Sequence, residues 1–412
     1  MKNIGIKAIS IFAILLTIIS CSNSTDNKND KSDQSAITRI TLDVSLEELV
    51  TALAGDAANN PTFQQAIQNA TEQHLFEGGD LVTLFGKEFE KIDPNGSLAS
   101  FFAYEFRNKG IDFNSSNSEV LKVLEKECDD AVDRTCQILR DRLRHLGTAS
   151  PIIKNLGDGK LLVELPAQES YLNRLSALLQ CKGQLEFWET YNFNEVYQDF
   201  IEADRVIARK TNYDSEDTIQ EHPLFSRLVP NLDHNSVVAA SACIGRAIAK
   251  DTAAINWMLN IAFQENVFRP DMKFAWTVKP EKYGEEELLE LIALKMSKDG
   301  KCALGGEAIS DARQDYNQIN QVEVALEMNR EGAKEWKRIT GYNIGRQIAI
   351  VFDNWVYSYP VVRDEISVGR CSIPGIMTVE EAQDLAAVLK AGKLPVSTRV
   401  ITVELVDPQQ VQ

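Results

Sequence analysis

The alternation of apolar and polar positions is most regular in a stretch near the C-terminal end of the chain. Residues 322–326 alternate and predict a strand with one buried face, and residues 329–341 predict a helix that follows it. A second strand is predicted at residues 347–352, before Asp353-Asn354, two residue types that tolerate the positive φ of a tight hairpin turn. Residues 355–362 are rich in aromatic and β-branched side chains and are predicted to form the second strand of the hairpin. The stretch predicts a compact unit of strand, helix and hairpin.

The same patterns organise the first third of the chain. Residues 37–44 alternate as a strand would, and a helix is predicted from Ser45 to about Ala54. Residues 60–109 show several short helical patterns, whose Phe side chains are expected to pack in a core. From residue 118 to 147 apolar side chains recur three and four positions apart, which predicts one long amphipathic helix.

Residues 150–190 complete a recognisable order of elements. Two strands are predicted at residues 152–155 and 160–165, then a helix at 170–180 and a strand at 184–190. Together with the first strand and the long helix, these pieces have the β-α-β-β-α-β order of a ferredoxin-like unit. The predicted fold class is therefore α+β, with a ferredoxin-like base subdomain at residues 37–191 that carries a helical N-terminal insertion at residues 45–115.

Residues 192–395 are interpreted as an inserted α+β head subdomain. Helices are predicted at residues 195–210, 236–248 and 285–296, and a strand-like stretch at 273–278. The last strand is expected near residues 399–406, where residues 396–412 return to the base and close the insertion.

Composition limits the size and the partners of the protein. A chain of 412 residues with 44% hydrophobic residues is long enough for two or three packed domains. Its formal net charge of −17 argues against binding to the phosphate backbone of nucleic acid.

The first 36 residues indicate export and anchoring. Lys2 and Lys7 flank the start of an apolar run, residues 8–19, that is too short to span a bilayer. The sequence Ile18-Ile19-Ser20-Cys21 resembles a bacterial lipobox, so residues 1–20 are expected to be a lipoprotein signal peptide and Cys21 the lipidated residue. The alternative is an ordinary secretory signal in which Cys21 falls at this position by chance. Residues 21–36 are polar and are expected to form a disordered tether.

No catalytic, metal-binding or cofactor-binding residues are expected. The four histidines, at positions 74, 145, 222 and 234, lack the spacing of a zinc site, and the nucleophile-elbow, dinucleotide-binding and Walker motifs do not occur. Cys128 and Cys136 lie too far apart on one helix to form a disulfide. The other four cysteines after Cys21, at positions 181, 243, 302 and 371, have no framework spacing, and buried free thiols are the expectation although pairing is allowed in this compartment.

Four segments resemble the first periplasmic domain of the SecD subunit of the Sec protein translocase, including fused SecDF forms. These are NIGRQIAIVFDNWVYS at residues 343–358, TVEEAQDLAAVLKAGKLP at 378–395, GKLLVELPA at 159–167 and the long helix at 119–147. The resemblance implies a base that carries an inserted head, and a head that engages exported polypeptide. SecD also has membrane helices that couple to proton flow, and this chain is expected to act without its own energy input.

The lipobox predicts a lipid-anchored protein that faces the periplasm. The resemblance implies that this protein is non-enzymatic and binds unfolded or exported polypeptide, or docks on components of the Sec translocon. The alternative is an envelope lipoprotein that retains the fold and binds an unrelated partner. Trp355, Tyr357 and Tyr359 lie two apart on one predicted strand and are the candidate polypeptide-binding residues. The competing interpretation is that these rings pack on the helix at 329–340 as ordinary core. Strand addition at an exposed sheet edge is the expected mode of binding. In this mode the peptide backbone forms hydrogen bonds with the edge strand, so that many peptide sequences are tolerated.

Overall fold

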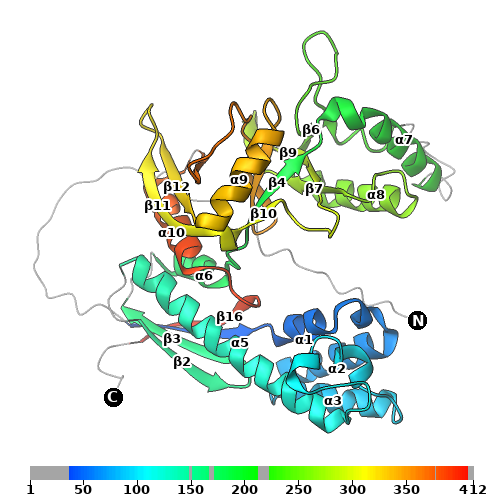
Figure 1. Cartoon of the computed structure of the whole chain (residues 1–412), viewed down its shortest axis with the longest axis vertical. Coiled ribbons are helices and arrows are strands. Elements are labelled where there is room, and N and C mark those ends of the chain that lie inside the picture. The colour runs from blue at the N-terminus through cyan, green and yellow to red at the C-terminus, as the bar shows by residue number, and fades with distance from the viewer. Residues whose placement is uncertain (1–36, 148–150, 167–170, 212–221, 376, 407–412) are drawn as a thin grey trace, which may run out of the picture.

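The computed structural model describes residues 37–147, 151–166, 171–211, 222–375 and 377–406. It is a mixed α+β structure that contains three antiparallel sheets within these residues. A four-stranded sheet with its helices forms the lower part of Figure 1, and the two other sheets lie above it. We call them the base sheet, the large sheet and the small sheet.

The base sheet has the strand order β16 (Thr398–Val406), β1 (Ile37–Val44), β3 (Lys160–Pro166) and β2 (Ile152–Gly157). All neighbours are antiparallel. Apolar side chains of β1 and β3 lie in one core cluster with the long helix α5 (Asn117–His145), and α6 (Leu172–Gln180) contacts β16. The opposite face of the sheet carries ion pairs, in which Glu164 contacts Arg39 and Lys154. The strands and the long helix predicted in this part of the chain are confirmed.

The prediction that residues 184–190 close this unit is wrong. The segment forms a strand, β4 (Leu185–Thr190), but β4 pairs with strands of the large sheet, and β16 occupies the place beside β1. The physical reason is the composition of β4, whose neighbouring residues Phe187 and Trp188 are both buried and point to opposite faces. Such a strand needs apolar cover on both faces, whereas one face of the base sheet carries the ion pairs of Glu164.

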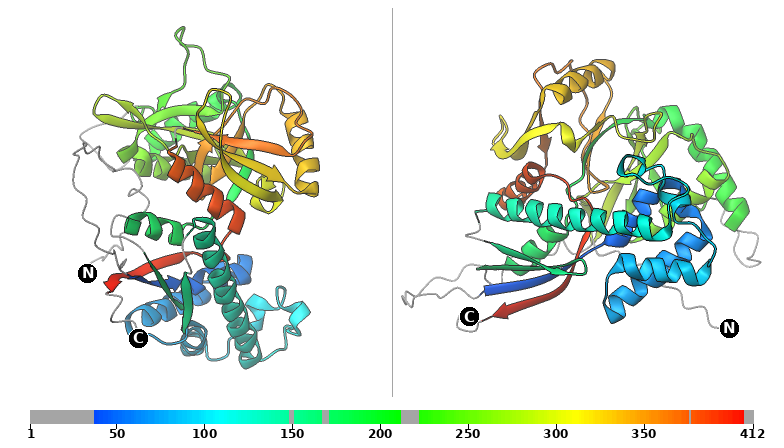
Figure 2. Two further views of the ribbon diagram at one scale, coloured as in Figure 1. Left: turned by 90° about the vertical axis from the view of Figure 1, so that its left-hand side faces the viewer. Right: turned by 60° about the horizontal axis from the view of Figure 1, so that its bottom comes forward.

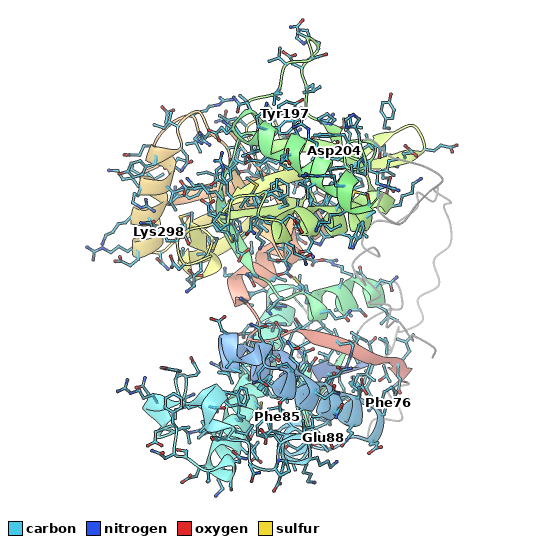
Figure 3. The ribbon with its side chains drawn as sticks, turned by 90° about the vertical axis from the view of Figure 1, so that its right-hand side faces the viewer. Phe76, Phe85, Glu88, Tyr197, Asp204 and Lys298 are labelled. Carbon is cyan, nitrogen blue, oxygen red and sulfur yellow. The ribbon has the colours of Figure 1, made fainter. Side chains whose placement is uncertain are left out.

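The helical insertion predicted between β1 and α5 is present (Figure 3). Its Phe side chains form a core, with the rings of Phe63 and Phe85 5.3 Å apart and those of Phe89 and Phe101 5.7 Å apart. Asn60 and Asp80 cap two of the helices by accepting hydrogen bonds from backbone N–H groups. The elements are α1 (Leu46–Ala54), η1 (Gly55–Asn59), α2 (Pro61–Glu77), α3 (Leu81–Ile92), α4 (Ala99–Phe102) and η2 (Arg107–Lys109).

The large sheet has nine strands and curls back toward itself. Its main path is β14-β13-β4-β9-β6-β5, while β10 pairs with β4, and β7 and β8 pair with β9. A parallel bridge between Thr277, just after β7, and Val356 in β14 joins the outermost strand of this path to the region beyond β7. The strands are β5 (Val229–Pro230), β6 (Cys243–Ile248), β7 (Met272–Trp276), β8 (Glu281–Tyr283), β9 (Glu286–Lys295), β10 (Leu304–Gly305), β13 (Ile348–Phe352) and β14 (Trp355–Ser358).

Two helices, α7 (Phe193–Thr211) and α8 (Thr252–Gln264), share a second core cluster with residues of β6, β7 and β9. The predicted helix at residues 195–210 and the strand-like stretch at 273–278 are confirmed by α7 and β7. The short 3-10 turn η5 (Ala249–Asp251) precedes α8, which the sequence pattern did not predict.

The helices predicted at residues 236–248 and 285–296 are wrong. The strands β6 and β9 occupy these positions. Glu, Leu and Ala give β9 a strong helix propensity, but β9 has β6 and β4 along one side and β7 and β8 along the other. Pairing on both edges and burial of four consecutive residues, 291–294, outweigh a propensity of at most about 1 kcal/mol per residue.

The small sheet has the order β11 (Ile309–Tyr316), β12 (Val322–Met328) and β15 (Arg370–Pro374). The helix α9 (Arg330–Tyr342) follows β12 and is capped by Asn329, which accepts a hydrogen bond from the Gly332 N–H at 2.8 Å. The helix α10 (Val379–Ala391) lies between this sheet and α5 (Figure 2, left), and it contacts β11, β12 and α5. The short turn η6 (Gly306–Ala308) precedes β11.

The hairpin predicted around Asp353-Asn354 is confirmed. β13 and β14 pair antiparallel, and the two turn residues have φ values of 47° and 70°. Within the part of the chain that the structure describes, no helix has both the length and the apolar character that crossing a membrane requires.

Candidate functional site

Tyr357 and Tyr359 line a hollow of about 220 Å³ at the seam where β14 meets the region between β7 and β9. The two side chains are half-buried, so part of each ring faces the hollow. The third predicted residue, Trp355, is not among the lining residues and packs against the cluster shared by α7 and α8. The structure therefore brings two of the three predicted site residues together. The remaining lining residues are Thr277, Lys279, Glu281, Leu288, Glu290 and Val356.

Glu290 holds the polar side of this hollow in place. Its carboxylate accepts a hydrogen bond from the Tyr359 hydroxyl and two from the Arg246 guanidinium, at 3.0 and 2.9 Å. Burial, together with the hydrogen bond to Glu290, raises the pKa of Tyr359 above its ordinary value. Burial also raises the pKa of Tyr357, whose ring meets Phe352 edge to face at 5.6 Å. Both phenols therefore remain neutral near pH 7 and present aromatic surface with a polar tip.

The rim of the hollow connects the large sheet to α10. The Lys279 ammonium lies 3.3 Å from a carboxylate oxygen of Glu381 in the first turn of α10. The half-buried Leu288 and the buried Val356 provide aliphatic wall. The hollow therefore combines aromatic and aliphatic wall with charged side chains that are already paired within the protein.

The backbone edge of β14 is not open at this seam. The Val278 N–H donates to the Val356 carbonyl at 2.9 Å, and the bridge between Thr277 and Val356 continues the contact. The expectation of an exposed sheet edge is therefore wrong for the centre of β14, because the curled sheet supplies a partner there. A ligand at this hollow would therefore contact side chains and not the backbone of Val356.

A second hollow, of about 500 Å³, lies where β4 and β9 end and α7 begins. Sequence reasoning missed it, because its residues come from four separate stretches of the chain and no local spacing indicates that they lie together. Its lining residues are Glu189, Thr190, Tyr191, Glu195, Arg269, Lys295, Tyr342, Asn343 and Arg346.

The cysteines of the described residues are free thiols, at positions 128, 136, 181, 243, 302 and 371. Burial raises the pKa of the Cys128 thiol to about 12 and that of Cys302 to about 11, so neither is a ready nucleophile at neutral pH. Cys21, the predicted lipidation site, lies outside the described residues. Among the described residues no group of three or more His, Cys, Asp or Glu side chains is placed to hold a metal ion.

Family models match two parts of the chain. The model for the SecDF P1 head subdomain matches residues 290–396, and the model for the N-terminal part of the P1 domain of protein translocase subunit SecDF matches residues 132–192. These matches include β4, the small sheet, α10 and the hairpin that carries Tyr357.

Curated relatives match over longer stretches. The protein translocase subunit SecD of Rhodothermus marinus is 33% identical over 385 residues, which is 90% of this chain and 61% of the relative. The SecDF subunit of Thermus thermophilus is 27% identical over 301 residues, 73% of this chain and 31% of the relative. The chain thus spans about three fifths of the first relative's length and about a third of the second's.

A solved structure of SecDF, described as a membrane component that enhances protein export, is 25% identical and has a TM-score of 0.39. It covers 67% of this chain, and this chain covers 94% of it. The family assignment rests on the sequence matches. The chain contains the periplasmic P1 domain of the SecD and SecDF family of protein translocase subunits, with its N-terminal part and its head subdomain.

Proposed function

We propose that this protein binds exported polypeptide, or docks on Sec translocation machinery, through its head and without enzymatic activity. The observation that supports the proposal is the hollow lined by Tyr357 and Tyr359, which combines aromatic rings, aliphatic wall and a fixed carboxylate. Its lining residues Glu290, Val356, Tyr357 and Tyr359 lie in the part of the chain that is similar to the SecDF head subdomain, and the other four come from the segment just before that part. Half-buried Tyr side chains provide contact area at a small cost in conformational entropy, and they accept many apolar partners. We therefore expect weak, sequence-tolerant binding.

The test is a titration of the full chain with an unfolded secretory polypeptide. Tyr359→Ala and Leu288→Ser should each weaken binding, because both remove apolar surface from the hollow. The matched control is Tyr283→Ala, since Tyr283 is a Tyr on β8 with 74% of its surface exposed and does not line the hollow. Thermal melting of each variant shows that it is folded. Equal affinity of wild type, Tyr359→Ala and Leu288→Ser would exclude this hollow as the polypeptide site.

Crosslinking in cells separates the possible partners. Recovery of translocon components or nascent exported chains would support the proposal. Recovery of one defined, unrelated envelope protein would support an interaction lipoprotein that retains the fold.

We also propose that Cys21 carries a lipid that anchors the protein to a membrane on the periplasmic side. The support is the lipobox-like sequence before Cys21 and the polar segment that separates it from β1. Each methylene of a buried acyl chain contributes about 0.8 kcal/mol to anchoring. Cys21→Ser should move the protein from the membrane fraction to the soluble fraction. A variant that stays membrane-bound and resists salt and carbonate extraction would show that the anchor lies elsewhere.

The domain organisation is part of this proposal. The order β1, α5, β2, β3, α6 and β16 is that of a ferredoxin-like unit, with strand order 4-1-3-2 in the base sheet. We propose that this unit, with its helical insertion, is the base, and that the head runs from β4 to α10. The base is continuous with the polar segment after Cys21, because β1 is its first element.

A further inference from the structure

The hollow of about 500 Å³ is rich in cationic side chains although the whole chain has a net charge of −17. Arg269, Lys295 and Arg346 line it together with two carboxylates, Glu189 and Glu195. Its volume lies within the range of pockets that hold small ligands or a few residues of a peptide.

Most of these charged groups are already engaged. The guanidinium of Arg346 donates to both carboxylate oxygens of Glu195, at 2.8 and 2.7 Å. The Asn343 side-chain amide donates to a carboxylate oxygen of Glu189 at 2.8 Å. The Arg269 guanidinium donates to the Glu195 carbonyl at 3.2 Å. These contacts fix the walls of the hollow before any ligand arrives.

Lys295 is the exception. It is exposed at the end of β9, and none of the ion pairs found among the described residues includes it. Its ammonium lies 5.7 Å from the centre of the Tyr191 ring, and the Arg269 guanidinium lies 5.1 Å from the same ring. The Tyr191 hydroxyl donates to Asp271 at 2.7 Å, which holds the ring in this position. Arg346 pairs with Glu195, and Arg269 lies 3.5 Å from a carboxylate oxygen of Asp199 outside the lining, so Lys295 is the lining cation that has no ion-pair partner among the described residues.

We propose that this hollow binds the terminal α-carboxylate of a polypeptide. The single ammonium of Lys295 matches a monoanion, whereas a phosphate dianion would face Glu189 and Glu195. Tyr342, with 76% of its surface exposed, stands at the rim and offers an aromatic face to the terminal side chain. Capture of a chain terminus by a carboxylate site is a known mode of peptide recognition. The inference rests on the proposed function, since it specifies which part of an exported polypeptide the head contacts.

The experiment titrates the full chain, by calorimetry, with a short apolar peptide that ends in leucine, as the free acid and as the C-terminal amide. The amide should bind about tenfold more weakly, because it lacks the charge that Lys295 contacts. Lys295→Gln should weaken binding of the free acid by a similar factor and leave the amide unchanged. Lys295→Arg should retain the preference for the acid. The matched control is Lys298→Gln, which removes the same charge from an exposed lysine three residues away that does not line the hollow (Figure 3).

Each outcome separates this inference from the proposed function. If the free-acid and amide peptides bind equally well, or if Lys295→Gln still prefers the free acid, the carboxylate site is overturned. The proposal that the protein binds polypeptide is not affected by this result. Preference for the acid that persists in Tyr359→Ala supports two separate subsites. A further peptide is the C-terminal amide with a glutamate placed inside its sequence. If this glutamate restores binding, the hollow binds acidic side chains, and the assignment to the chain terminus is wrong. Binding of neither peptide also overturns the inference, and the titration with unfolded polypeptide then decides the proposed function alone.

Discussion

At the scale of single residues, Arg142 has an unusual position, because it is a fully buried cation on α5. Its guanidinium donates to the carbonyls of Leu178 at 3.3 Å, and of Lys182 and Gly392 at 3.0 Å each, and also to that of Cys181. These carbonyls belong to the last turn of α6 and to the connections that follow α6 and α10. Gly183 leaves room for this contact, since a Cβ there would lie 2.6 Å from the guanidinium.

We predict that Arg142→Met lowers the free energy of unfolding by about 3 kcal/mol, because it leaves buried carbonyl groups without donors. Urea titration measures the change. The control is Arg134→Met on the exposed side of the same helix, which should change the stability by less than about 0.5 kcal/mol. A similar loss in both variants would show that the buried hydrogen bonds of Arg142 contribute little.

The turn at Asp353-Asn354 gives a second prediction at this scale. Asn354 has a φ of 70°, and proline is restricted to about −65° and lacks the N–H. Asn354→Pro should therefore cost about 1–3 kcal/mol and lower the melting temperature. Asn354→Gly keeps the positive φ and serves as the control. An unchanged melting temperature in Asn354→Pro would contradict the hairpin.

At the scale of elements, a buried charge cluster ties α2 to the base sheet. His74 on α2 lies 3.5 Å from a carboxylate oxygen of Asp43 on β1, and Arg399 on β16 pairs with the other oxygen. The second ring nitrogen of His74, Nδ1, donates to the Gly79 carbonyl at 2.7 Å, which leaves Nε2 to face Asp43.

The two pKa shifts in this cluster are coupled. The hydrogen bond to Asp43 raises the pKa of His74 against the effect of burial, and Lys160 on β3 opposes the rise. Burial tends to raise the pKa of Asp43, but His74 and Arg399 outweigh it and hold the pKa below its ordinary value.

The raised pKa of His74 predicts a pH dependence with a definite sign. Its stabilising contribution is fully present below the unfolded pKa of about 6.5 and is lost as the pH rises through the higher folded value. The stability difference between wild type and His74→Gln, measured by urea unfolding, should therefore be larger at pH 6 than at pH 8.5. The control is His145→Gln, which changes an exposed histidine in the last turn of α5. A difference that is constant with pH would show that His74 contributes by packing alone.

At the scale of the whole molecule, one hydrophobic cluster runs from the base sheet to the small sheet. It includes Ile40 on β1, Leu139 on α5, Leu385 on α10 and Val324 on β12. The helix α10 contacts both α5 and the small sheet, so it joins the two halves of the structure. A base and a head expressed separately would each expose part of this cluster, which is why the binding experiments above use the full chain.

We predict that Leu385→Ala destabilises the base and the small sheet together, at a cost of about 2–5 kcal/mol. Hydrogen exchange should show faster exchange in β1, β3 and β12 at once. The same substitution at Leu259, a buried residue of α8 in the second cluster, should affect α7 and α8 most strongly. Unchanged exchange in β1 and β3 after Leu385→Ala would mean that the two halves are energetically independent.

The amino-acid sequence by itself determined the features that depend on neighbours along the chain. The long helix α5, the cap of α9 at Asn329 and the turn at Asp353-Asn354 follow from local spacing, side-chain hydrogen bonds and tolerance of positive φ. The candidate residues Tyr357 and Tyr359 could be found in this way because they lie two apart along the chain, Tyr357 on β14 and Tyr359 directly after its end.

The tertiary structure decided the features that depend on partners distant in sequence. β9 is a strand although its composition favours a helix, because four other strands pair along its two edges. β4 joins the large sheet and β16 the base sheet, because strand pairing satisfies both burial and backbone hydrogen bonds and does not depend on sequence separation. The hollow around Lys295 could not be predicted for the same reason: its walls come from segments that only the folded chain brings together.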